Sequence, residues 1–234
     1  MQRSYALLVL LVLPSLSWGQ DEIFEEIVVF ASKSDDGYYG TPAVTLTRQA
    51  DFLVQNIRLV NDSRSPDLRR KEIISTIENL LGRAKSMDGM ALSYGTGFLE
   101  PIDLDENSLK LLEDRQRADT NYIDINAKIA FDPKRDSKKQ IEELRVFVSG
   151  AKISGRTEIV PQGDIGLSIV GPEQYRYAII EKIGSENAKI LKSMNAICDV
   201  AIRGLENRVE WERTGLSELM LYIPYELEVS DCAK

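Results

Sequence analysis

The spacing of apolar residues switches repeatedly along this chain between strand and helix periods, and this alternation limits the fold more than any other feature. In TNYIDINAKIAF, residues 120–131, apolar side chains occupy every second position, which predicts a half-buried strand. In SRSPDLRRKEIISTIENLLGRAKSM, residues 63–87, they recur every three to four positions, which predicts an amphipathic helix. Ser65 suits the N-cap of that helix and Pro66 its first position.

The order of these segments predicts the class of fold. Strand patterns occupy residues 50–62, 90–104, 120–131, 163–171, 197–212 and 216–230, and further helix patterns occupy residues 132–151 and 172–196. Strands that follow each other without an intervening helix pair antiparallel. We therefore predict an α+β fold, a mixed or antiparallel sheet with helices packed on it, in which a strand–helix–strand–strand arrangement occurs twice. The repetition suggests halves at 50–155 and 156–230 of a main domain at 50–230, either by duplication or as two modules with a common arrangement.

The first nineteen residues have the parts of a cleaved secretory signal. Arg3 precedes the apolar run YALLVLLVLPSL, and SWG places small residues just before Gln20. The run falls short of the roughly 20 apolar residues that span a bilayer, although a retained anchor is the alternative. We expect residues 1–19 to be a signal peptide, residues 20–49 an N-terminal strand and linker, and the mature chain to be exported without a transmembrane segment. The periplasm of a Gram-negative bacterium is the expected compartment, with secretion as the alternative.

The composition excludes several functions. The chain has no histidine, which removes Ser-His-Asp and Cys-His catalysis and the usual histidine ligands of zinc and copper. Its net charge of −8 argues against nucleic-acid partners, which need a basic surface. We expect no catalytic residues, no cofactor and no metal. A hydrolase that uses carboxylates is the alternative, although no pair of carboxylates is singled out by the sequence.

The two cysteines, Cys198 and Cys232, predict a disulfide, because an even pair in an oxidising compartment is usually bonded. Closing a loop of about 34 residues would stabilise the fold by roughly 3–4 kcal/mol in the chain-entropy model. The alternative is that Cys198 is a buried free thiol and Cys232 a free thiol in a loose C-terminal segment.

Other motifs are weaker. YGTGF, residues 94–98, lacks the Gly-Lys-Ser/Thr of a phosphate-binding loop, and we interpret it as a bulge within a strand. The acidic residues in DLDEN, 103–107, do not have the spacing of a calcium loop. Four aromatic residues could line a ligand groove, but their spacing favours sheet packing; they are Phe98, Trp211, Tyr222 and Tyr225.

The segment EEIVVFASKS, residues 25–34, resembles the start of a docking segment in TonB-dependent outer-membrane receptors. Residues 25–31 are therefore either the first strand of the domain or an exposed docking strand of an accessory protein for that transport machinery. The apolar IVVFA favours burial. The candidate interaction strand comprises Glu26, Ile27, Val28, Val29 and Phe30.

From about residue 50 to residue 229, the order of elements resembles the SIMPL family of exported periplasmic immunogenic and outer-membrane proteins. Its strand-to-helix passage and closing strand are similar to GLSIVGPEQYRYAIIEKIGSENAKIL and MLYIPYELEV. The family's opening Gly-x-Gly is absent from VVFASKSDDGYYGTPAVTLTRQAD, which indicates a divergent member. The resemblance implies a non-enzymatic domain that binds or self-assembles, in some members into rings, with roles in envelope stress. We accordingly expect self-association or an envelope-protein partner.

Overall fold

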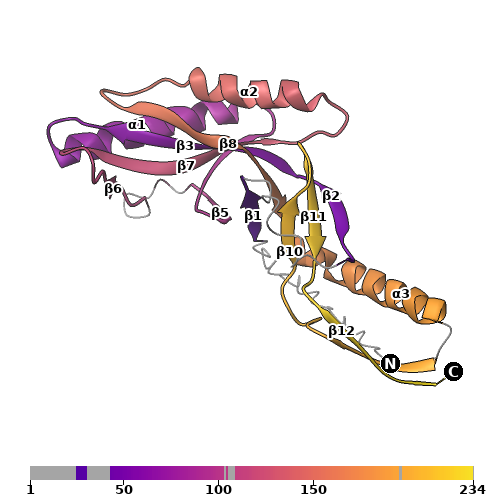
Figure 1. Cartoon of the computed structure of the whole chain (residues 1–234). Helices are drawn as coiled ribbons and strands as arrows, with labels where there is room; N and C mark the ends of the chain where they lie inside the picture. The colour runs from indigo at the N-terminus through magenta and orange to yellow at the C-terminus, as the bar shows by residue number, and fades with distance from the viewer. Residues whose placement is uncertain (1–24, 31–42, 103, 105–108, 195–196, 234) are drawn as a thin grey trace, which may run out of the picture.

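Six antiparallel strands of this computed structural model pair around a closed ring, in the order β3–β8–β1–β5–β4–β7 and back to β3 (Figure 1). The structure describes residues 25–30, 43–102, 104, 109–194 and 197–233. The predicted signal peptide and most of the predicted linker lie outside these ranges. The strands of the ring are β1 (Glu26–Val29), β3 (Phe52–Asn61), β4 (Met90–Tyr94), β5 (Phe98–Pro101), β7 (Asn121–Ala130) and β8 (Glu158–Val170).

Strand β3 has long pairings along both of its edges. It pairs with β7 along its whole length, from Phe52 opposite Ala130 to Asn61 opposite Asn121, and with β8 along its other edge. Strand β1 closes the ring between β8 and β5, and the short β6 (Leu112–Glu113) extends the sheet beside β7. The predicted α+β class with antiparallel pairing is confirmed.

Two helices cover the outer face of the ring (Figure 1). Helix α1 (Pro66–Lys85) begins as predicted, because the side chain of Ser65 accepts a hydrogen bond from the amide of Leu68. Helix α2 (Ser137–Ser149) is capped by Asp136, whose carboxylate accepts a hydrogen bond from the amide of Lys139. Leu68, one of the apolar residues that recur at helical spacing in 63–87, is 42% exposed rather than buried. The fully buried side chains between helices and sheet include Ile57, Leu59, Ile73, Ile77, Leu80, Ile125, Leu144 and Phe147.

Glu72 anchors α1 to the end of β3 and to the segment just before β8. Its Oε2 accepts hydrogen bonds from Asn61 Nδ2 (2.7 Å), Ser63 Oγ (2.7 Å) and the amide of Arg156 (3.0 Å). These hydrogen bonds lower the pKa of the Glu72 carboxyl, and the bond from Asn61 contributes most. Gly155 approaches this carboxylate with a φ of +56°, a conformation that side chains with a Cβ rarely adopt.

Replacing Gly155 by alanine is expected to lower the free energy of unfolding by about 2 kcal/mol or more. The new Cβ would lie 2.0 Å from Cδ of Glu72 in addition to straining the backbone. Gly163→Ala is the matched control, because Gly163 has a φ of +60° with nothing within 4 Å of the added Cβ. Urea denaturation of both variants separates strain from collision. Equal losses would show that the contact with Glu72 does not matter.

A second, three-stranded sheet lies beside the ring and is ordered β10–β11–β2. Its strands are β10 (Glu210–Arg213), β11 (Glu218–Tyr222) and β2 (Leu46–Gln49). The Arg213 guanidinium reaches the carbonyl oxygen of Ile165 on β8, and the amide of Ala50 donates to the carbonyl of Ser217. Leu219, Leu221 and Ile223 are fully buried in the same core as the outer face of the ring.

Helix α3 (Arg176–Met194) and the ribbon formed by β9 (Ile197–Arg203) and β12 (Glu226–Ala233) make up an arm that projects from the ring (Figure 1). A short helix, η2 (Pro172–Tyr175), leads into α3, and β9 pairs antiparallel with β12 in this two-stranded ribbon. Among the residues described, no helix is both long and apolar enough to cross a membrane.

Three strand predictions are corrected. Residues 197–212 form two strands because Gly204, with a φ of +90°, turns the chain after β9. Residues 216–230 likewise divide at Pro224, which has no amide proton for a ladder. The segment 90–104 is a hairpin of β4 and β5 rather than one strand.

The proposed halves at 50–155 and 156–230 do not correspond to separate structural units. The strand–helix–strand–strand order does recur, as β3–α1–β4–β5 and then β8–α3–β9–β10. However, β8 completes the ring with strands from the first half, whereas β9 and β10 belong to different sheets. The boundary after residue 155 therefore cuts through the closed sheet.

Candidate interaction site

The arm is fixed to the body at its base by polar contacts around Arg176. The guanidinium of Arg176 donates to the carbonyl oxygens of Leu205 (2.8 Å) and Asn207 (2.6 Å) and pairs with Glu173 (2.8 Å). Burial opposes ionisation of Glu173, but hydrogen bonds from the amide of Val209 and from Arg176 outweigh it and lower the pKa of that carboxyl. These bonds join η2 and α3 to the segment between β9 and β10 at the base of the arm.

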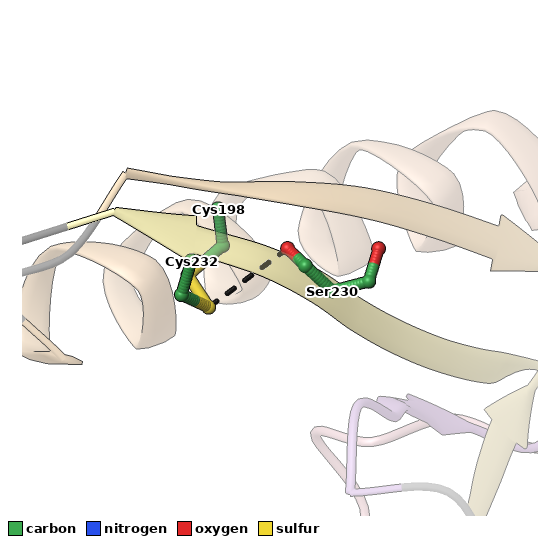
Figure 2. Close-up of a disulfide and its surroundings, with 3 residues drawn as sticks. All are labelled: Cys198, Ser230 and Cys232. Carbon is green, nitrogen blue, oxygen red and sulfur yellow. Dashed lines mark hydrogen bonds between the residues drawn. A yellow bond between two sulfur atoms is a disulfide. The ribbon is translucent and has the colours of Figure 1, made fainter.

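A disulfide between Cys198 and Cys232 locks the far end of the ribbon (Figure 2). It joins β9 to the C-terminal end of β12, where the strand register shifts between Ser230 and Ala233. Cys232 Sγ lies 3.9 Å from the carbonyl oxygen of Ser230. The predicted pairing of the two cysteines is confirmed, and the C-terminal strand is tied to β9 rather than loose.

The ribbon has one apolar and one charged face. Because Leu227 pairs with Ile202 and Val229 with Val200, these four side chains share a face. The opposite face carries acidic and basic residues, and Arg203 Nη2 lies 3.1 Å from Glu228 Oε2 in an exposed ion pair. Ile202 packs against the edge of the main core, whereas Val200 is 36% exposed.

Helix α3 continues its inward stripe beyond the body of the protein. Ile179 and Ile183 are fully buried, but Ile190 and Met194, on the same stripe further along, are 45% and 50% exposed. Between them Asn187 is 4% exposed, and neither polar atom of its amide has a partner among the described residues. The far end of the arm therefore presents apolar surface from both helix and ribbon, as interaction surfaces do.

A buried ion pair lies on the inner face of the ring, away from the helices. Glu26 of β1 pairs with Lys128 of β7, and these side chains are only 10% and 12% exposed. Ser168 Oγ donates to Glu26 Oε1 at 2.7 Å, and the Lys128 ammonium lies 4.3 Å from the centroid of the Phe52 ring. Every charged atom here has a partner, and Ser168 is fully buried. The cluster therefore closes the ring and offers no accessible nucleophile.

Of the two alternatives for the candidate interaction strand, this arrangement agrees with the first strand of the domain, which burial of IVVFA favoured. Glu26, Ile27 and Val28 are buried, and Val29 and Phe30 are half-buried. Both edges of β1 are paired, with β5 on one side and β8 on the other. The strand is therefore an integral part of the ring, and its backbone is not free to add to a partner's sheet.

A surface groove of about 950 Å³ lies at the open end of the ring, beside β6. Arg58 in it is held by Asp124 through two bonds of 2.7 and 2.8 Å and stacks 4.0 Å from the centroid of Tyr122. The bond to Asp124 raises the pKa of the Arg58 guanidinium. The remaining charged lining residues are of both signs, so the groove does not favour one class of ligand; they are Lys110, Glu113, Asp114, Arg115, Arg117 and Glu158.

The other sequence candidates are not brought together. YGTGF is the turn of the β4–β5 hairpin, where a Cβ on Gly95 would lie 2.2 Å from the carbonyl oxygen of Phe98. The cluster at 103–107 lies largely outside the described residues, and those that are described include no grouping of metal ligands. The four aromatic residues do not form a groove, because Trp211 and Tyr222 face opposite sides of their sheet. Burial, and then the neighbouring Glu210 and Glu212, raise the pKa of the Tyr222 hydroxyl.

Sequence reasoning missed the buried ion pair between Glu26 and Lys128 and the exposed apolar residues at the far end of the arm. The only signal for the first was Lys128 within the most regular strand pattern, where an alternating polar residue is expected to face solvent. The exposed apolar residues of the arm looked like core residues, because periodicity does not show where a sheet ends.

No family model, curated protein or solved structure matches the chain.

Proposed function

We propose that this chain is an exported protein of the bacterial envelope, of SIMPL-like type, that acts by binding or self-assembly rather than by catalysis. The observation that carries the proposal is the arm, which exposes apolar residues and whose two-stranded ribbon is cross-linked by a disulfide. A ribbon of two strands is marginally stable alone, and the disulfide holds it in a form that can be recognised. Disulfides persist in oxidising compartments, which agrees with the leader sequence.

Export is tested by expressing the full chain with its leader in a Gram-negative host and separating the cell fractions. The protein is expected in the periplasm, beginning at Gln20, with no thiol that reacts before reduction. A double Cys198→Ser, Cys232→Ser variant serves as the thiol-free control. An intact leader on a cytoplasmic protein with two reactive thiols would contradict the proposal.

The two alternative functions, docking to transport machinery and hydrolysis by carboxylates, make different demands on the structure. Docking to TonB-dependent machinery through residues 25–31 requires a free strand edge, and β1 has none. The hydrolase that uses carboxylates stays a prediction, tested by a glycosidase and esterase screen of the exported chain. Turnover in that screen would contradict a purely non-catalytic role.

A further inference from the structure

The two strands of the ribbon differ in how well their outer edges are protected. Edge strands that avoid pairing with other chains use charges and bulges. Strand β12 has both: Glu226 and Glu228 are acidic, its register shifts after Ser230, and Asp231 has a φ of +48°. Strand β9 also carries charges, but Asp199 and Arg203 are of opposite sign; its register is regular, and its outer edge has no paired strand among the described residues. The edge of β9 is therefore the one suited to accept another strand.

The charges of β9 are self-complementary. Asp199 and Arg203 stand two residues on either side of Ala201, and all three share the charged face of the ribbon. If β9 pairs antiparallel with β9 of a second copy about Ala201, Asp199 of each copy lies opposite Arg203 of the other. Paired side chains are then about 4.5–5.5 Å apart at Cβ, close enough for two ion pairs. Arg203 would be shared between Glu228 of its own chain and Asp199 of the second copy.

The apolar face is self-complementary in the same register. Val200 lies opposite Ile202 of the second copy, so each apolar row continues across the seam into a four-stranded sheet. The row reads Val229 and Val200 from one copy, then Ile202 and Leu227 from the other. Both exposed tips of α3 belong to the arms that this sheet joins.

Only one register gives this result. Centring the pairing on Val200 or Ile202 places Asp199 or Arg203 opposite Ala201 and leaves the charges unmatched. Pairing β12 with its own copy about Leu227, the matching centre of that strand, places Glu226 of each copy opposite Glu228 of the other, which is unfavourable. We propose that two copies of this chain associate by antiparallel pairing of their β9 strands about a twofold axis at Ala201.

This inference rests on the proposed self-assembly, and charge reversal tests it on the full exported chain. Asp199→Arg and Arg203→Asp are each expected to weaken self-association about tenfold or more, because the twofold axis makes both pairs repulsive. Mixing the two single variants should give a heterodimer, since one carries two positive and the other two negative charges at these positions. Glu142→Lys reverses an exposed charge on α2, outside the arm, and is the control that should leave the mass unchanged.

Light scattering and analytical ultracentrifugation distinguish the outcomes. If the native chain dimerises and the single variants dimerise equally well, the β9 seam is wrong while self-assembly stands. If the native chain is a monomer, both are wrong. Because Arg203→Asp also disturbs the pair with Glu228, Ala201→Cys gives a second readout: oxidation should link two copies through position 201. Glu228→Cys should not link them, and equal linking of both variants would overturn the register.

Discussion

Replacing Lys128 by methionine is expected to lower the free energy of unfolding by about 3–5 kcal/mol, because it leaves a buried carboxylate without its counter-ion. Glu26 would keep only the hydroxyl of Ser168 in a site where its side chain is 10% exposed. The strand that carries Glu26 is also the one that closes the ring. Urea denaturation followed by circular dichroism measures the loss.

Two controls separate a broken pair from general damage. Arg58→Met breaks the Arg58–Asp124 pair between β3 and β7, where the side chains are 36% and 31% exposed, and should cost under about 1 kcal/mol. The double variant Glu26→Leu, Lys128→Met should be more stable than Lys128→Met alone, because it removes both charges. If Lys128→Met and Arg58→Met cost the same, the pair with Glu26 does not hold the ring closed.

Removing the disulfide is expected to have the second large effect. The double Cys198→Ser, Cys232→Ser variant should lose roughly 3–4 kcal/mol of stability, because a loop of about 34 residues is no longer closed in the unfolded chain. Hydrogen exchange should show the loss of protection first in β9 and β12, whose ribbon has no third strand among the described residues.

The control compares the stability of the native protein before and after reduction with that of the double serine variant. Reduction of the native protein should reproduce the stability of the double serine variant, and the same reductant should leave that variant unchanged. Equal denaturation midpoints for the oxidised protein and the variant would mean that the cross-link does not restrain the arm.

The sequence was sufficient wherever local chemistry decides the structure. Ser65 and Pro66 start α1 as predicted, and the strand predicted at residues 120–131 forms as β7 (Asn121–Ala130). The pairing of cysteines followed from compartment and number. In each case the residues that decide the outcome lie within one element or are chemically unique in the chain.

The rest depends on contacts between distant residues. Ring closure joins Glu26 to Ser168, 142 residues apart, and no local pattern indicates that pairing. The first half of β8 was missed because Pro161 and Gly163 are typical of loops, although Pro161 lies where β8 has no second neighbour among the described strands. Asn126 was expected on a solvent face and is fully buried, because the face turns into the ring.

The measurement that tests the central claim most directly is the solution mass of the oxidised, exported chain over a range of micromolar concentrations. Light scattering should show a mass that rises with concentration to at least twice that of one chain, and the rise should fall away with the Asp199→Arg variant. A strict monomer across that range would contradict self-assembly through the arm.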